Sequence, residues 1–365
     1  MERYLRDLLS AIPAPDRAAM EAARERQASL AKPPHSLGRL EDLSVQLAGI
    51  TGRLYNPMDR RRVLVFASDN GIVEEGVASC PQSVTLSQTI NFTRGLTGVA
   101  VLAKHFGAEL DVIDVGINAD FRQPGVRDRK IAHGTRNFIR EPAMDREQAL
   151  QALRVGVEAA DRARDEGVQI LGVGEMGIGN TSTSSAVLSA LLKLPAAQTV
   201  SRGAGINDVS FARKIAVIDE AIARWQPDPS DPIDALGKVG GFDLAAMCGA
   251  FLGAARNRMP AVIDGFISAV AALCAFRLNP LCAAYLIPSH ASEEKGYRIA
   301  MEEMKLSPML NLSMRLGEGS GCPIALEIVA ASQSVIRDMA TFAEAAIDDG
   351  YLHEIRGNKA FQGEA

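Results

Sequence analysis

The sequence predicts an α/β protein with a doubly wound, mostly parallel sheet, and three observations lead to this prediction. Its 365 residues are 47% hydrophobic and only 23% charged, which is the composition of an Ala/Gly/Val/Leu-rich globular enzyme. Short uninterrupted apolar runs, such as residues 63–67, end in polar or glycine-rich segments, as buried parallel strands do. These runs alternate with helical sequence, so we expect ligand sites at the carboxyl ends of the strands.

Local signals predict the individual elements. Asp16 is expected to cap a helix that runs to about residue 30, and residues 147–166 read as an amphipathic helix. The apolar runs predict strands at residues 63–67, 110–117, 168–174, 261–264 and 283–287. The length of the chain predicts either one large domain with a smaller one, or two domains.

Composition also excludes several functional classes. A net charge of −5 gives no electrostatic reason to expect nucleic acid or an anionic membrane as a partner. The longest uncharged apolar runs, residues 244–255 and 265–276, are too short to cross a bilayer, and residues 1–16 lack the apolar core of a signal peptide. Five scattered cysteines without metal spacing read as reduced thiols of a cytoplasmic protein: Cys80, Cys248, Cys274, Cys282 and Cys322.

Residues 316–321 (LGEGSG) place one carboxylate, Glu318, between glycines just before a long apolar run. Glycine on both sides permits unusual backbone angles and the close approach of a substrate. Pro323 is expected in the first turn of the following helix, so Glu318 would lie on a loop at a helix N-terminus. Such a carboxylate can serve as a general base. The alternative is a turn whose glutamate only complements the helix dipole.

The predicted strand that ends at Gly174 leads into a glycine-rich turn and then a helix that opens with hydroxyl residues. Such a turn offers backbone N–H groups to an anion, although a tight turn with a serine and threonine cap explains the pattern as well. It matches neither a P-loop nor a full dinucleotide fingerprint.

Other polar groups lie at the ends of predicted elements. Lys214 follows a second glycine turn around Gly203, and it is either a phosphate partner or a solvated surface lysine. Asp243 and Ser292 lie at the ends of other expected strands or helices. His290 reads as a structural histidine rather than a base. We expect no metal site, because no pair of potential ligands has convincing spacing.

Six segments together resemble one known family: residues 32–41 (KPPHSLGRLE), 69–76 (DNGIVEEG), 174–181 (GEMGIGNT), 238–243 (KVGGFD), 264–268 (DGFIS) and 315–321 (RLGEGSG). In this order and spacing they are similar to the nicotinate-nucleotide:dimethylbenzimidazole phosphoribosyltransferases, the family called CobT. The resemblance runs from about residue 5 to about residue 340.

The resemblance implies transfer of a phosphoribosyl group from nicotinate mononucleotide to 5,6-dimethylbenzimidazole, for the lower ligand of cobalamin, without a cofactor. It also implies a homodimer with a small helical domain built from both chain ends. We therefore expect that domain to begin in residues 1–50, a large α/β domain in residues 51–300, and the small domain to be completed by residues 301–365, which would carry the catalytic loop.

The family's functional residues correspond to positions here. The catalytic proton acceptor falls on Glu318, and two further groups of residues would bind the substrates. The nucleotide site would include Glu175, Gly177, Gly203, Lys214, Asp243, Ser292 and the neighbouring Gly317. The base pocket would include Cys80, Gln88 and Met176.

Three positions depart from the residues that are common in the family: His35, Asn70 and Cys80. Two other functions stay open on the sequence alone. A related branch of enzymes uses phenol or p-cresol as the acceptor, and Gln88, which can hydrogen-bond a ring nitrogen, argues against that use here. The second alternative is a non-catalytic partner subunit, which would have no need of Glu318.

Overall fold

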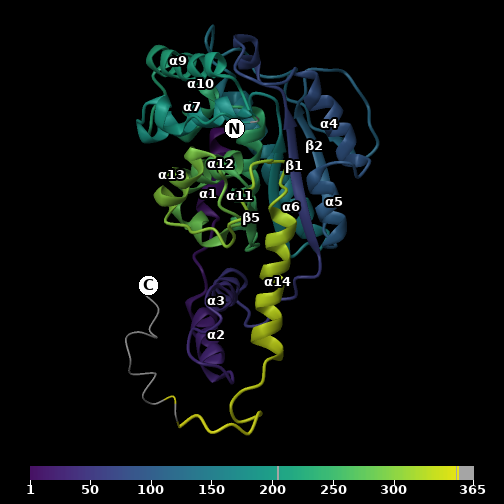
Figure 1. Ribbon diagram of the computed structural model, residues 1–365, viewed down its shortest axis with the longest axis vertical. Coiled ribbons are helices and arrows are strands. Elements are labelled where there is room, and N and C mark those ends of the chain that lie inside the picture. The colour runs from purple at the N-terminus through teal and green to yellow at the C-terminus, as the bar shows by residue number, and fades with distance from the viewer. Residues whose placement is uncertain (204, 351, 353–365) are drawn as a thin grey trace. The chain divides into compact units, whose positions relative to one another are not determined.

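The computed structural model describes residues 1–203, 205–350 and 352 (Figure 1). The chain forms two compact units. The larger unit contains residues 1–13 and 60–325, and the smaller one contains residues 14–59 and the described residues from 326 onward.

The termini divide between the units differently from the expected boundaries. Residues 1–13 belong to the larger unit, because Leu5 and Leu8 are buried there and two backbone carbonyls are bound. The carbonyl of Leu9 accepts a hydrogen bond from Asn279 at 2.9 Å, and that of Pro13 accepts one from Tyr285 at 2.7 Å. Residues 301–325, including Glu318, also belong to the larger unit.

In the described part of the chain, six strands form one parallel sheet in the order β3-β2-β1-β4-β5-β6. The strands are β1 (Arg61–Ser68), β2 (Glu109–Gly116), β3 (Val126–Asp128), β4 (Ile170–Met176), β5 (Ala261–Ile263) and β6 (Leu286–Pro288). The chain winds outward from β1 to β3 and then returns to β4 on the other side of β1. This reversal opens a crevice at the carboxyl ends of β1 and β4, where ligands bind in sheets of this kind.

Helices cover both faces of the sheet, with α4 and α5 on one side and α11 and α12 on the other (Figure 1). The α-helices of the larger unit are α1 (Glu2–Ser10), α4 (Ser83–Thr93), α5 (Gly98–His105), α6 (Arg146–Asp165), α7 (Asn180–Leu192), α8 (Ala196–Thr199), α9 (Asp208–Trp225), α10 (Pro232–Val239), α11 (Phe242–Arg256), α12 (Phe266–Leu278) and α13 (Lys295–Met304). Two 3₁₀ helices, η1 (Gly71–Glu75) and η2 (Pro280–Tyr285), lie in the same unit.

Helices α6 and α11 approach each other so closely that glycine is required at the contact. A Cβ atom on Gly156 would lie 1.8 Å from the carbonyl oxygen of Ala246, and one on Gly249 would lie 1.8 Å from that of Leu153. Neither position therefore accepts a side chain without moving backbone. The buried side chains of α11 thus pack directly on α6, in a core made largely of small residues.

The smaller unit is built from α2 (Arg17–Ser29), α3 (Arg39–Thr51) and the part of α14 (Cys322–Asp338) that follows residue 325. Ala23, Ala48 and Ile336 form its buried contact. Arg26 joins two distant segments of the chain, because it donates to the carbonyl of Ile336 at 3.1 Å and to that of Met339 at 3.0 Å.

Most of the expected elements are present. The side chain of Asp16 caps α2 by accepting from the N–H of Ala19 at 3.0 Å. The expected strand at residues 283–287 is wrong in its first half, because Pro280 and the cap at Asn279 start a 3₁₀ helix that lasts to Tyr285. The three-residue strand β3 carries no apolar run, so no pattern in the sequence predicted it. No helix in the described residues is long and apolar enough to cross a membrane.

Candidate active site

A cavity lies at the carboxyl ends of the strands in the larger unit. Most of the residues that the sequence singled out line it: Cys80, Glu175, Met176, Gly177, Gly203, Lys214, Ser292 and Gly317. The other three, Gln88, Asp243 and Glu318, lie just behind this lining. The fold therefore brings the predicted site residues together from widely separated stretches of sequence.

Glu318 lies on a strained turn. Gly317, Glu318 and Gly319 all adopt left-handed backbone angles, with φ values of +83°, +64° and +85°. A left-handed conformation is costly for a residue with a side chain, and such strain is typical of functional sites. The glutamate is 6% exposed, and Oε1 accepts a hydrogen bond from Nε2 of Gln88 at 2.8 Å. Oε2 is buried and has no hydrogen-bond partner in the described residues.

Asp264, at the carboxyl end of β5, anchors this turn. Its two carboxylate oxygens accept hydrogen bonds from the N–H groups of Gly319 at 3.0 Å and Gly321 at 2.7 Å. The turn also rests on β4, because a Cβ atom on Gly174 would lie only 2.5 Å from the backbone of Gly319. Gly174 in β4 and Asp264 after β5 thus determine where Glu318 is held.

Glu175 and Asp243 form a buried carboxyl pair bridged by Asn180. The amide of Asn180 donates to both, and its distance to Oδ2 of Asp243 is 3.0 Å. Burial and the charge of Asp243 raise the pKa of Glu175 to about 8. Burial raises the pKa of Asp243 to about 6 and that of Asp264 to about 7. Glu175, which lines the cavity, therefore holds its proton at neutral pH.

Lys214 is buried rather than solvated, which excludes the surface alternative. It is 1% exposed, and its ammonium group donates to Oγ1 of Thr181 at 2.8 Å. Burial lowers its pKa to about 8. Thr181 lies in the first turn of α7, where the positive end of the helix dipole favours an anion. Lys214, Thr181 and the turn of Gly203 form the cationic end of the cavity.

A second turn of the cavity wall, residues 176–179, is clamped from both sides. The N–H of Ile178 donates to Oγ1 of Thr85 at 3.1 Å, and its carbonyl accepts from Nδ2 of Asn70 at 3.4 Å. Gln82 in turn donates to the carbonyl of Asn70 at 3.4 Å and accepts from Nδ2 of Asn118 at 3.2 Å. The segment after β1 therefore supports the wall formed by the end of β4.

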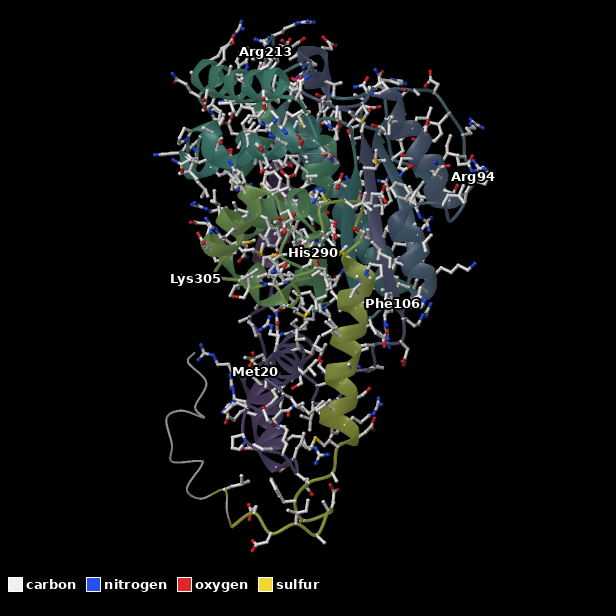
Figure 2. All side chains as sticks on the ribbon, in the orientation of Figure 1. Met20, Arg94, Phe106, Arg213, His290 and Lys305 are labelled. Atoms are coloured by element: carbon white, nitrogen blue, oxygen red, sulfur yellow. The ribbon has the colours of Figure 1, made fainter. Side chains whose placement is uncertain are left out.

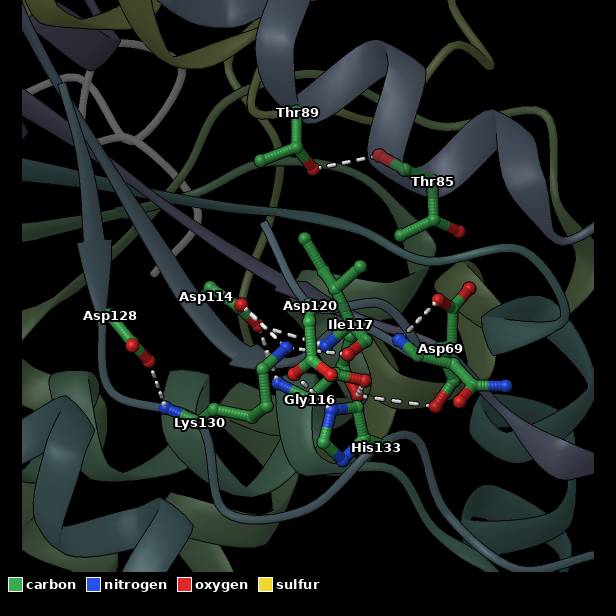
Figure 3. A network of polar contacts seen from close by, with 12 residues as sticks. Asp69, Thr85, Thr89, Asp114, Gly116, Ile117, Asp120, Asp128, Lys130 and His133 are labelled. Atoms are coloured by element: carbon green, nitrogen blue, oxygen red, sulfur yellow. Dashed lines mark hydrogen bonds and ion pairs between the residues drawn. The ribbon is translucent and has the colours of Figure 1, made fainter. Parts of the chain in front are cut away.

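Figure 3 shows the network that fixes the loop after β2 beside β1. Asp114 accepts hydrogen bonds from the N–H groups of Gly116 and Ile117 at 3.0 and 2.8 Å and pairs with Lys130 at 2.7 Å. Asp69 accepts from the N–H of Asn118 at 2.8 Å, and its burial raises its pKa. These contacts hold Asn118 where it can support Gln82 and, through it, the cavity wall.

The structure shows which groups Gln88 contacts, and it reveals two site residues that the sequence did not predict. Gln88 was predicted to contact a ring nitrogen of the base, but both ends of its amide bond protein groups: Nε2 to Glu318, and Oε1 to Asn91 at 3.3 Å. Asn180 and the anchoring role of Asp264 were not predicted. Their signal was present, since each lies in a polar segment that follows a strand.

Neither a metal centre nor a disulfide is found in the described part of this site. Among the residues that the structure describes, no group of three or more His, Cys, Asp or Glu side chains could hold a metal ion. All five cysteines are free, and Cys80 is a lining residue of the cavity.

An α/β sheet with a switch-point cavity, a buried cation at one end and a buried carboxylate at the other defines an enzyme that handles an anionic small molecule. A family model described as phosphoribosyltransferase matches residues 12–347.

The similar proteins narrow this class. A Clostridium perfringens nicotinate-nucleotide–dimethylbenzimidazole phosphoribosyltransferase is 50% identical over 98% of this chain and 99% of its own. One from Ruminiclostridium cellulolyticum is 49% identical over 90% and 94%. The crystal structure of CobT from Thermus thermophilus matches with a TM-score of 0.88 and 38% identity, over 91% of this chain and 100% of that one. The chain belongs to the family of nicotinate-nucleotide–dimethylbenzimidazole phosphoribosyltransferases.

Proposed function

We propose that this enzyme transfers the phosphoribosyl group of nicotinate mononucleotide to 5,6-dimethylbenzimidazole. The products are α-ribazole 5′-phosphate, which supplies the lower ligand of cobalamin, and nicotinate. The observation that carries the proposal is the presence of two buried groups at one site. Lys214 lies at the cationic end, and Glu318 has a carboxylate oxygen without a partner among the described residues.

The chemistry needs few groups. Nicotinate is bound to C1′ through a cationic ring nitrogen, so the glycosidic bond breaks with its electron pair returning to that nitrogen, and no acid is required. One benzimidazole nitrogen forms the new bond to C1′, and the proton on its other nitrogen passes to Oε2 of Glu318. Lys214 and the N-terminus of α7 hold the 5′-phosphate, which positions C1′ between the two rings.

The surrounding groups support these roles. The turn of Glu318 is fixed by Asp264 and Gly174, and its Oε1 is held by Gln88, so Oε2 has a defined direction. A preorganised carboxylate near C1′ also favours the positive charge that develops on the ribose as nicotinate leaves. Cys80 and Met176 offer soft, apolar surfaces to a flat ring.

Product analysis tests the proposal. Purified enzyme is incubated with nicotinate mononucleotide and, separately, with dimethylbenzimidazole, unsubstituted benzimidazole, phenol and p-cresol. We expect α-ribazole 5′-phosphate and nicotinate to form in equal amounts from dimethylbenzimidazole, at a higher kcat/KM than either phenol supports. Preferential use of p-cresol, or no transfer to any acceptor, would contradict the proposal.

We further propose that the enzyme is a homodimer of the cytoplasm. Its reduced cysteines and its small, charged nucleotide substrate support the location. Sedimentation velocity of the purified protein measures the oligomeric state, and a single monomeric species at micromolar concentration would contradict a stable dimer.

A further inference from the structure

His290 lies in the cavity without a role in the chemistry above. It follows β6 closely, is 2% exposed, and is labelled in Figure 2. Its ring lines the cavity together with Ser292, two residues later. The packing fixes the ring, because a Cβ atom on Gly321 would lie 2.2 Å from Nδ1. The imidazole is therefore held in one orientation by the same turn that carries Glu318.

The contacts of Ser289 determine which ring nitrogen carries the proton. Oγ of Ser289 is 3.2 Å from the carbonyl oxygen of Asp264 and 2.9 Å from Nδ1 of His290. A hydroxyl has a single proton, and the carbonyl can only accept. Both contacts are satisfied when Ser289 donates to the carbonyl and Nδ1–H of His290 donates to Ser289. Nε2 then carries a lone pair. Burial lowers the pKa of His290, which also keeps the ring neutral.

Nε2 of His290 and Oγ of Ser292 both lie near one point of the cavity wall, at Gly265. They lie 3.9 and 3.7 Å from the position that a Cβ atom would take on Gly265. Oγ of Ser292 accepts a long hydrogen bond from the N–H of Glu294 at 3.5 Å, and its own proton has no acceptor in the described residues. This point of the cavity is therefore flanked by one acceptor and one donor.

A neighbouring donor and acceptor match a hydroxyl group, which both accepts and donates one hydrogen bond. They do not match a carboxylate or a phosphate, because these groups only accept and would oppose the lone pair of Nε2. We propose that His290 and Ser292 bind one ribose hydroxyl of the nucleotide, His290 as the acceptor and Ser292 as the donor. The inference rests on the proposed function, since it assigns a part of the same substrate.

Two substitutions of His290 separate the contact of Nδ1 with Ser289 from the proposed contact of Nε2 with the ribose hydroxyl. In His290→Asn the amide reaches only the position of Nδ1, so it keeps the contact with Ser289 and loses the acceptor in the cavity. In His290→Gln the amide oxygen reaches the position of Nε2. We expect His290→Asn to lower kcat/KM for nicotinate mononucleotide about 10-fold, as for one lost hydrogen bond to a buried group, and His290→Gln to recover most of that loss.

The test measures unmodified enzyme and both variants with nicotinate mononucleotide, its 2′-deoxy and 3′-deoxy analogues, and nicotinate riboside. Each ratio of variant to unmodified enzyme is taken within one substrate, so the different reactivities of the substrates cancel. We expect the loss in His290→Asn to fall below about 2-fold with one of the deoxy analogues and to persist with the other three substrates.

An equal loss with all four substrates would overturn the proposal. So would a loss that disappears with nicotinate riboside alone, because this would assign His290 to the phosphate. Thermal denaturation of both variants reports folding independently of activity. The rate of the unmodified enzyme on nicotinate mononucleotide reports the proposed function separately, so a failure there is distinguishable from a failure of the hydroxyl assignment.

Discussion

At the residue scale, the proposed chemistry depends on two buried side chains of opposite charge, Glu318 and Lys214. One carboxylate oxygen of Glu318 accepts a hydrogen bond from Gln88, and the other has no partner among the described residues. Lys214 donates a hydrogen bond to the hydroxyl of Thr181. Each group is already desolvated, so in the proposed roles each would interact more strongly with substrate than an exposed group. Substitution of either one therefore gives a distinct kinetic signature.

We expect Glu318→Gln to lower kcat by about 10²–10⁴, because a glutamine has the same shape but cannot take a proton. Its amide oxygen can still accept from Gln88, so the turn keeps its geometry and the affinity for nicotinate mononucleotide changes little. Steady-state kinetics and isothermal titration calorimetry measure the two effects. A kcat close to that of the unmodified enzyme would show that Glu318 is not the proton acceptor.

We expect Lys214→Ala to weaken nicotinate mononucleotide binding about 10- to 100-fold, because a charged hydrogen bond to the phosphate is lost, and to leave dimethylbenzimidazole binding unchanged. Since the pKa of Lys214 is lowered to about 8, the unmodified enzyme should lose nucleotide affinity as pH rises from 7 to 9. The variant should not show this dependence. The exposed Lys104 provides a control, as Lys104→Ala should change neither property. Equal weakening of both ligands would contradict the phosphate role.

At the scale of elements, two turns depend on anchoring side chains for their geometry. The turn of Glu318 is anchored by the side chain that follows β5 and by the backbone of β4. In the smaller unit, the turn before α3 is anchored by Lys32 and Glu41, which form a buried ion pair at 2.7 Å, and Glu41 also accepts from the N–H of Leu37 at 3.0 Å. Both turns contain residues with positive φ, so their geometry depends on these anchors.

We expect Asp264→Asn to lower kcat about 10- to 100-fold without removing any group that contacts substrate in the mechanism above. An asparagine offers one oxygen to two N–H donors, so the N–H of Gly319 or Gly321 loses its partner and the turn that carries Glu318 shifts. Leaving one buried donor unpaired should also cost about 1–3 kcal/mol of stability. Kinetics and urea denaturation measure these changes. Unchanged kcat in a destabilised variant would show that Asp264 supports the fold alone.

Two substitutions in the turn before α3 should change the free energy of unfolding in opposite directions. His35 has φ +58°, a conformation that glycine adopts without strain, so His35→Gly should stabilise the protein by about 0.5 kcal/mol after the larger entropy of the unfolded chain is subtracted. Gly38 has φ +48° and ψ −120° with open space around it, so Gly38→Ala should destabilise by about 1–3 kcal/mol through backbone strain alone. Urea denaturation of both variants measures the difference. Stabilisation by Gly38→Ala would contradict this account.

At the scale of the whole molecule, the buried carboxyl groups make stability depend on pH. The pKa values of Asp243, Asp264 and Glu175 are raised to about 6, 7 and 8, above those of the unfolded chain. Between about pH 4.5 and 8 the folded protein therefore holds more protons than the unfolded protein. These three groups therefore make the free energy of unfolding fall as pH rises through this interval. Lys214 and His290, whose pKa values are lowered, act in the opposite direction, and Lys214 does so mainly above pH 8.

We expect the free energy of unfolding to fall by about 2 kcal/mol or more between about pH 6 and pH 8. Glu175→Gln removes the group with the highest pKa, so its curve should be flatter between about pH 7 and pH 8.5. Urea denaturation at a series of pH values gives both curves. A free energy of unfolding that rises over this range would show that these carboxyl groups are ionised in the folded protein.

The sequence by itself determined most of the sheet, although not β3, and the glycine-flanked turn that carries Glu318. Apolar runs such as residues 63–67 form buried strands because removing apolar side chains from water is favourable. This driving force does not depend on where the strand lies in the fold. The glycines beside Glu318 permit positive φ, which is a property of single residues. The six family motifs predicted the reaction because several of them lie at the ends of strands and helices, where the site is built.

Only the tertiary structure decided which groups meet. Gln88 and Glu318 are 230 positions apart, and Asp264 lies 55 positions before Gly319, so no local pattern relates their side chains. Lys214 could be a solvated residue of an amphipathic helix on its sequence alone, but the fold covers it and lowers its pKa. Hydrophobic pattern and backbone propensity act over a few residues, whereas hydrogen bonds, burial and pKa shifts depend on what the rest of the chain places next to each group.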